Sequence, residues 1–136
     1  LVFATGIVPV FNTMIQAVTE PGDKVIISRP VYHPMAFAIE DNGREISDNS
    51  LIYRDGAYTM DFEDLRRRAE DPKAKLMLVC SPHNPVGRAW KEEELYQISS
   101  IWQGKLGLWS YVTRFTRISC FTEISTYQWG PWELRL

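Results

Sequence analysis

The chain has 136 residues, of which 45% are hydrophobic and 24% charged, and its formal net charge is −2. This balance is typical of a folded globular domain and argues against a disordered chain or a disulfide-rich secreted scaffold. The charge does not point to nucleic acid as a partner, and no apolar run approaches the roughly 20 residues of a membrane span. Two cysteines, Cys80 and Cys120, are too few for a disulfide framework and fit a reduced, cytoplasmic compartment.

Helix and strand signals alternate along the first part of the chain, which predicts an α/β fold with right-handed crossovers and a mostly parallel sheet. Asp61 is expected to cap a helix, with Asp64 completing a capping box. The continuous apolar run from Leu76 to Cys80 is typical of an inner strand covered on both faces. Periodicity and turn residues predict a helix that begins at Pro9 and further helices over residues 34–42, 61–69 and 92–102. They predict strands over residues 24–28, 44–47, 51–53 and 76–80.

Two loops carry residues suited to ligand binding. Residues 5–9 lead from a glycine directly into a helix, whose free N–H groups and dipole suit an anion such as phosphate. The alternative is a plain connection. Residues 81–88 contain two prolines and a glycine that would fix the backbone and aim Asn84, whose amide can donate to a phenolic oxygen. The alternative is a tight turn in which Asn84 bonds its own backbone.

Several segments occur together in an order that one enzyme superfamily shares. Gly-Ile-Val-Pro at 6–9, Pro-Val-Tyr at 30–32 and Pro-His-Asn-Pro-Val-Gly-Arg at 82–88, with those at 19–23, 41–44 and 60–65, resemble the pyridoxal-phosphate-dependent class I/II aminotransferase superfamily of fold type I. Within it, the chain looks like the MalY/PatB-like branch of cystathionine β-lyases. The resemblance covers about residues 1–101 and implies part of the three-layer large, cofactor-binding domain.

The resemblance implies cofactor contacts at five positions. Gly6, Ile7 and Val8 match the loop whose backbone amides hold the phosphate of pyridoxal 5′-phosphate. Tyr32 matches the aromatic residue that stacks on the pyridine ring, although an ordinary half-buried loop tyrosine is the alternative. Asn84 matches the residue that bonds the 3′ oxygen of the cofactor. No metal site is expected.

The resemblance also shows what this chain lacks. Members of the family act on amino-acid substrates as homodimers, and β-elimination from cystathionine-like substrates yields a thiol, pyruvate and ammonia. They need an aspartate beside the pyridinium nitrogen and a lysine that binds the cofactor covalently. No aspartate follows Asp71, and the family lysine would lie beyond Leu136. We therefore expect an incomplete, inactive piece with no catalytic residue, in which Arg88 is solvated or caps a helix and Trp90 is structural.

The composition changes after residue 98. Only Glu123 and Glu133 are acidic there, yet four of the five tryptophans lie in this part. Reading each codon one base early permits Asp-Glu-Ile-His-Ser-Asp-Phe across residues 113–119, which is the family's aspartate-bearing motif. We therefore expect residues 102–136 to be a non-homologous, out-of-frame tail that does not pack like the family's next strand. A frameshift, a mispredicted exon or a sequencing error between Ile98 and Gly107 would produce it.

Two other functions are consistent with the sequence. The chain could act as a non-catalytic interaction module that pairs with an intact homologue. It could also be an unrelated α/β domain whose only site is the phosphate-binding turn at residues 6–9. This last hypothesis predicts no preference for pyridoxal phosphate over phosphate itself.

Overall fold

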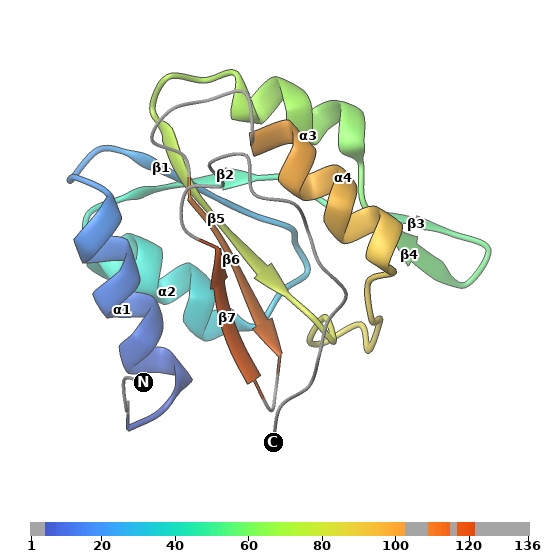
Figure 1. The fold of residues 1–136 in the computed structure, drawn as a ribbon, viewed down its shortest axis with the longest axis horizontal. Helices are drawn as coiled ribbons and strands as arrows, with labels where there is room; N and C mark the ends of the chain where they lie inside the picture. Colours follow the sequence, from blue (N-terminus) through green and yellow to red (C-terminus); the bar gives the residue numbers. More distant parts are fainter. Residues whose placement is uncertain (1–4, 103–108, 115–116, 122–136) are drawn as a thin grey trace.

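The structure is a computed structural model that describes residues 5–102, 109–114 and 117–121, with side chains described as far as residue 101. Helices and strands alternate along most of this part of the chain, as the sequence predicts (Figure 1). The helices are α1 (Ile7–Val18), α2 (His33–Asp41), α3 (Phe62–Ala69) and α4 (Glu92–Trp102). The strands are β1 (Lys24–Ile27), β2 (Glu45–Asp48), β3 (Ile52–Arg54), β4 (Ala57–Thr59), β5 (Ala74–Cys80), β6 (Trp109–Arg114) and β7 (Arg117–Phe121).

The main sheet is mostly parallel, which confirms the predicted fold class. Its strand order is β2-β1-β5-β6-β7, so β5 lies in the middle, flanked by β1 and β6. The pairs β1–β2, β1–β5 and β5–β6 are parallel, and β7 is antiparallel to β6. A helix lies in the connection before each later parallel strand: α2 precedes β2, α3 precedes β5 and α4 precedes β6. The chain therefore returns to the same end of the sheet before each of these strands begins.

Helices cover both faces of the sheet, which gives three layers (Figure 1). Successive side chains of a strand point to opposite faces, and the core divides accordingly. Val25 and Ile27 of β1 pack with α1 and α2, whereas Ile26 packs with α3 and α4. In β5, Leu78 packs on the side of α1 and α2, and Met77 packs on the side of α3 and α4. All five of these side chains are at most 1% exposed. A strand buried on both faces is what the apolar run in β5 predicts.

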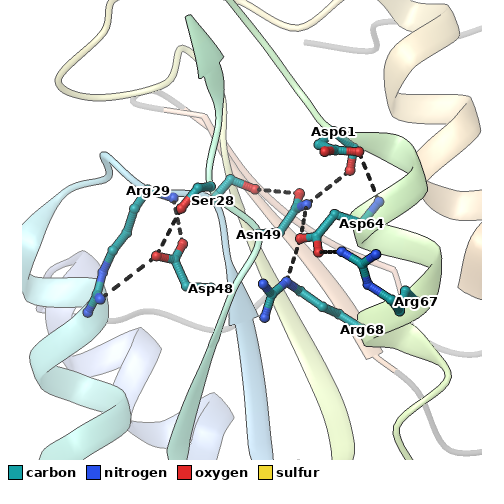
Figure 2. Close-up of polar contacts among 9 residues, drawn as sticks. Ser28, Arg29, Asp48, Asn49, Asp61, Asp64, Arg67 and Arg68 are labelled. Carbon is teal, nitrogen blue, oxygen red and sulfur yellow. Dashed lines mark hydrogen bonds and ion pairs between the residues drawn. The ribbon is translucent and has the colours of Figure 1, made fainter.

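A buried polar cluster joins the ends of β1 and β2 to the start of α3 (Figure 2). Asn49, which is fully buried, donates from Nδ2 to the carbonyl oxygen of Asp61 at 2.9 Å and to Oδ2 of Asp64 at 2.9 Å. Its Oδ1 accepts from the hydroxyl of Ser28 at 3.4 Å. We call this set, with the two arginines that bind Asp64, the Asn49 cluster: Ser28, Asn49, Asp61, Asp64, Arg67 and Arg68.

The N-terminus of α3 is capped by Asp61, as predicted, but Asp64 does not complete a capping box. The Asp61 carboxylate accepts from the backbone N–H of Asp64 at 2.9 Å. The Asp64 carboxylate turns instead to Asn49, Arg67 and Arg68. Partial burial disfavours its ionised form, but the hydrogen bonds from Asn49 and the two arginines prevail and lower the pKa of Asp64 below its ordinary value. An aspartate is too short for the reciprocal bond that glutamate makes in a capping box.

The predicted elements differ from the observed ones mainly around residues 44–59. The predicted strands at 44–47 and 51–53 are each shifted by one residue, and β4 was not predicted at all. β3 and β4 form a separate antiparallel hairpin that turns at Asp55-Gly56, both in the left-handed region, with φ of 50° and 77°. Asp-Gly between two short strands is a strong hairpin signal, so this sequence already contained the evidence.

Part of the predicted out-of-frame tail pairs with the sheet. The backbone of β6 runs parallel to β5 from Leu76↔Trp109 to Cys80↔Thr113. Its tryptophan, tyrosine, valine and threonine favour strands, and β6 pairs with the edge of β5 that β1 does not occupy. The strand β7 of this tail pairs antiparallel with β6. Whether the side chains of these strands pack like those of a family strand lies outside the described residues, as do residues 103–108, 115–116 and 122–136.

Candidate functional site

The three predicted ligand-binding segments lie at one end of the sheet. In Figure 1 the start of α1, the start of α2 and the loop that follows β5 are all at the carboxyl end of the parallel strands. This is the edge at which open α/β sheets bind ligands. The fold therefore brings Gly6, Tyr32 and Asn84 to the same end of the molecule, although 78 positions separate the first from the last in the numbering.

The N-terminus of α1 has the features of an anion site. Gly6 is its N-cap and supplies no side-chain cap, and the first turn contains no acidic residue. The N–H groups of Ile7 and Val8 consequently keep their capacity to donate, and Gly6 and Val8 are exposed. Pro9 has no N–H to offer. The positive end of the helix dipole adds to these donors, so the turn suits a phosphate group.

Tyr32 is the N-cap of α2, directly before the helix begins. Its side chain is half-buried and packs against the core formed by α1, α2 and β5. Its backbone carbonyl accepts from the N–H of Met35 at 3.0 Å, which fixes the first turn. One face of a half-buried ring can pack on the core while the remainder meets a ligand. Both interpretations of Tyr32 therefore remain consistent with its position.

The loop after β5 holds Asn84 rigidly and leaves its amide unpaired. The backbone N–H of His83 donates to the carbonyl of Arg88 at 2.6 Å, and that of Gly87, with φ of 73°, donates to the carbonyl of His83 at 2.7 Å. The N–H of Asn84 donates to Sγ of Cys80 at 3.5 Å. Within residues 5–101 the side-chain amide of Asn84 has no hydrogen-bond partner. The alternative in which Asn84 bonds its own backbone is therefore not the observed conformation.

The side chains of Arg88 and Trp90 stabilise this loop. The prediction that Trp90 is structural is confirmed: it is 6% exposed, and its Nε1 donates to the carbonyl of Cys80 at 2.8 Å. Of the two predicted roles for Arg88, the solvated one is wrong and the structure favours the connection to a helix cap. Its guanidinium lies 4.4 Å from the centre of the Trp90 ring and binds Oε1 of Glu94 at 2.7 Å. Glu94 also accepts from the N–H of Lys91 at the start of α4, so Arg88 acts on the helix cap through Glu94.

The lysines of the described region are not placed to bind a cofactor covalently beside Asn84. Lys24 begins β1, Lys73 immediately precedes β5 and Lys75 is near its start, so all three lie at the amino end of the strands. A hydrogen bond from Lys24 to Asp71, with N···O of 2.7 Å, raises the pKa of this lysine. Lys91 is exposed ahead of α4, and Lys105 lies outside the described residues.

Two other kinds of site were searched for in the same residues. No group of three histidine, cysteine, aspartate or glutamate side chains in the described part of the chain could hold a metal ion. None of the described helices combines the length and the apolar character that crossing a membrane requires.

The available donors fit a phosphorylated aromatic ligand. Ile7 and Val8 offer N–H groups to a phosphate, Asn84 offers an amide to a phenolic oxygen, and Tyr32 offers an aromatic ring. Pyridoxal 5′-phosphate has this combination of groups. The residues present therefore fit the non-covalent part of a pyridoxal-phosphate site.

Known proteins resemble this chain in sequence over most of its length. The model of the family described as aminotransferase class I and II matches residues 1–112. Cystathionine beta-lyase PatB of Bacillus subtilis is 44% identical over 101 residues, which cover 74% of this chain and 26% of PatB. Protein MalY of Escherichia coli is 30% identical over 95 residues, which cover 70% of this chain and 24% of MalY.

A solved structure shows the same likeness in three dimensions. Cystalysin from Treponema denticola, whose crystal contains pyridoxal 5′-phosphate, has a TM-score of 0.76 and 42% identity over 79% of this chain and 27% of its own. The chain spans about a quarter of the length of these relatives. The predicted resemblance to the MalY/PatB-like branch is confirmed, and an unrelated phosphate-binding domain is excluded. The chain belongs to the aminotransferase class I and II family.

Proposed function

We propose that this chain is a segment of a pyridoxal-phosphate-dependent enzyme of amino-acid metabolism, either a cysteine-S-conjugate β-lyase or an aminotransferase. The segment supplies part of the cofactor site and has no activity by itself. The lyase assignment is supported by the name of cystathionine beta-lyase PatB and by the chain's 44% identity to it. The aminotransferase alternative is supported by histidinol-phosphate aminotransferases among the relatives, at about 30% identity or below.

One observation supports this proposal above the others: the uncapped first turn of α1 and the unpaired amide of Asn84 lie at the same end of the sheet. In the proposed site the backbone of Gly6, Ile7 and Val8 holds the phosphate. Asn84 donates to the 3′ oxygen, and Tyr32 packs against the pyridine ring. These contacts orient the ring and exclude water from one of its faces.

The bound cofactor would supply an electron sink for the substrate's α-carbon. The described residues can position such a ring, but they contribute neither of the two groups that the chemistry needs. No aspartate follows Asp71 to keep the ring nitrogen protonated. Lys24, Lys73 and Lys75 lie at the opposite end of the strands. We therefore expect binding without turnover.

Equilibrium dialysis of the 136-residue chain tests the proposal, with pyridoxal 5′-phosphate and inorganic phosphate as the two ligands. We expect the former to bind more tightly, because the ring contacts add to the phosphate contacts. No pyruvate should form from cystathionine. Equal affinities would contradict the cofactor site, and reproducible pyruvate formation would contradict the absence of activity.

For the remainder of the chain we propose that residues 1–101 are the homologous segment and that residues 102–136 are translated out of frame. Two bases of each shifted codon are nearly fixed by the amino acids present, so agreement with the family's motif over this length is improbable by chance. The nucleotide sequence across Ile98 to Gly130 is the test. Codons that do not spell Asp-Glu-Ile-His in the shifted frame would contradict the proposal.

We extend the proposal to the setting of the complete enzyme. Its substrate is an amino acid, its state is a homodimer and its compartment is the cytoplasm, with neither nucleic acid nor membrane as a partner. The buried free thiol of Cys80 is compatible with a reducing compartment. Light scattering of the frame-restored protein would test the homodimer, and a monomeric mass would contradict it.

A further inference from the structure

His83 is the most deeply buried ionisable side chain in the described core, with 2% exposure, and no role was predicted for it. Its Nε2 lies 2.9 Å from the carbonyl oxygen of Pro30. A carbonyl oxygen only accepts, so Nε2 must carry the proton and donate. Nδ1 is buried and has no partner among the described residues. The hydrogen bond to Pro30 thus ties the ring to a residue 53 positions earlier in the sequence.

This bond joins the two loops that carry the ring-contacting residues of the proposed site. Pro30 stands two residues before Tyr32, in the connection from β1 to α2. His83 is adjacent to Asn84, in the loop after β5. β1 and β5 are neighbouring parallel strands, so their loops emerge side by side.

The imidazole ring is held in place on its other side. The Trp90 ring meets it edge to face, with centroids 5.3 Å apart and an interplanar angle of 80°. Trp90 is in turn fixed by its hydrogen bond to Cys80 and by the guanidinium of Arg88. His83 thus cannot turn away from Pro30 without displacing a buried tryptophan, and the distance between the two loops is set by a rigid unit.

Filling this space with apolar volume does not by itself require a histidine. A leucine or methionine would occupy the same volume without burying an unpaired nitrogen, which carries a desolvation cost. What histidine adds is the Nε2 donor directed at Pro30. Burial lowers the pKa of His83 below its ordinary value and so favours the neutral ring. The backbone groups of Pro30, Ser28 and Cys80 oppose this shift, and the charge of Arg88 adds to it.

We propose that His83 is a positioning residue that holds the Tyr32 segment and the Asn84 loop at the spacing a pyridine ring requires. This inference rests on the proposed function. His83 touches no ligand itself. It acts through the two residues that do, by keeping the aromatic ring and the amide donor in register before a ligand arrives, so that binding need not order them.

The first test is made on the unliganded, unsubstituted chain, so it is independent of cofactor binding. Nitrogen-15 chemical shifts of the His83 ring at pH 7.5 report which nitrogen carries the proton. We expect the neutral form protonated at Nε2. A ring protonated at Nδ1, or one that exchanges between both forms, would overturn the proposal, because Nε2 could then not be a permanent donor to Pro30.

The second test compares two amide substitutions that differ in reach. In His83→Gln the amide nitrogen can occupy the place of Nε2, whereas in His83→Asn it falls short of Pro30. The ligands are pyridoxine 5′-phosphate, which has no aldehyde to react with lysines, and inorganic phosphate. We expect His83→Asn to bind pyridoxine 5′-phosphate about tenfold more weakly with phosphate affinity unchanged, and His83→Gln to remain within about threefold of the original chain.

The outcomes separate this inference from the proposed function. If the original chain does not prefer pyridoxine 5′-phosphate to phosphate, the proposed function fails whatever His83 does. If it does prefer it and folded His83→Asn binds as tightly, the positioning role is wrong. Equal losses for both ligands would also overturn it, since they indicate general damage. If His83→Asn does not fold, His83→Leu replaces it with the same expected results, and the ring protonation still decides the case.

Discussion

Two polar regions at the carboxyl end of the same sheet are built in opposite ways. In the Asn49 cluster each side chain is satisfied by another: Asn49 uses both ends of its amide, and the Asp64 carboxylate receives Asn49 and two arginines (Figure 2). In the loop after β5, by contrast, the side-chain amide of Asn84 is unpaired within residues 5–101. A saturated network stabilises the fold, whereas an unsaturated one keeps capacity for a ligand.

The largest expected effect comes from breaking the saturated region. Asn49→Ala removes the donor to Asp64 and to the Asp61 carbonyl in a fully buried position. We expect a loss of about 2 kcal/mol in the free energy of unfolding, because the Asp64 carboxylate and the Asp61 carbonyl each lose one of their hydrogen bonds and the hydroxyl of Ser28 loses its acceptor. Urea unfolding followed by circular dichroism measures it. The matched control is Asp48→Asn, which removes an exposed ion pair to Arg29 at 3.9 Å and should cost under about 0.5 kcal/mol.

Substitution of the asparagine in the loop after β5 should leave stability unchanged and weaken ligand binding instead. Asn84→Ala breaks no side-chain hydrogen bond of the described residues, so we expect a stability change within about 0.5 kcal/mol. The affinity for pyridoxine 5′-phosphate should fall by about 1.5 kcal/mol, the scale of one hydrogen bond to a charged or strongly polar oxygen. A stability loss comparable to that of Asn49→Ala would show that the two regions do not differ as we describe.

Tyr32 sharpens the comparison because both of its interpretations remain open. Tyr32→Leu keeps an apolar side chain against the core but removes the aromatic face, so we expect affinity for pyridoxine 5′-phosphate to fall by about 1 kcal/mol. Tyr32→Phe keeps the face and should bind like the original chain. Titration calorimetry measures both variants. Identical binding by the leucine and phenylalanine variants would leave Tyr32 as an ordinary half-buried loop residue.

The smallest expected effect is the change of stability with pH, because only one titrating group in each region, His83 and Asp64, contributes to it. The pKa of His83 is lowered in the folded chain, so the unfolded chain binds more protons once the pH falls below about 6.5, and stability decreases from there. The lowered pKa of Asp64 acts in a separate window: its contribution is complete above about pH 4 and is lost as the pH falls further.

Urea midpoints between pH 8 and pH 5 test the histidine part of this statement. The original chain should lose stability across this range relative to His83→Gln, whose side chain does not titrate. Parallel curves for the two proteins would contradict a buried, neutral His83.

Sequence reasoning reached those features that depend on local chemistry. Asp61 as a helix cap and the strand β5 covered on both faces follow from a single residue and from a short apolar run. The hairpin at Asp55-Gly56 was equally local and was overlooked. Local patterns also suggested the anion-binding turn of α1, while the individual roles of Tyr32 and Asn84 came from the family resemblance.

Features that depend on distant contacts were out of reach. Arg88 was predicted to be solvated or to cap a helix, and nothing in its neighbourhood in the sequence shows that its guanidinium packs on the Trp90 ring. His83 looked like one residue of a motif, and its bond to Pro30 exists only once β1 and β5 lie side by side. The Asn49 cluster likewise combines residues from three separate segments. Such contacts are properties of the sheet order, which periodicity alone does not determine.

The most direct test of the whole account is to map a bound ligand residue by residue. Pyridoxine 5′-phosphate is titrated into the nitrogen-15-labelled chain while backbone and side-chain amide resonances are followed. We expect the resonances of Gly6, Ile7, Val8, Tyr32 and the Asn84 side chain to shift together along one binding curve, and those of Asn49 to stay unchanged. Shifts confined to residues 6–8, or shifts centred on the lysines at the amino end of the strands, would contradict a shared cofactor site.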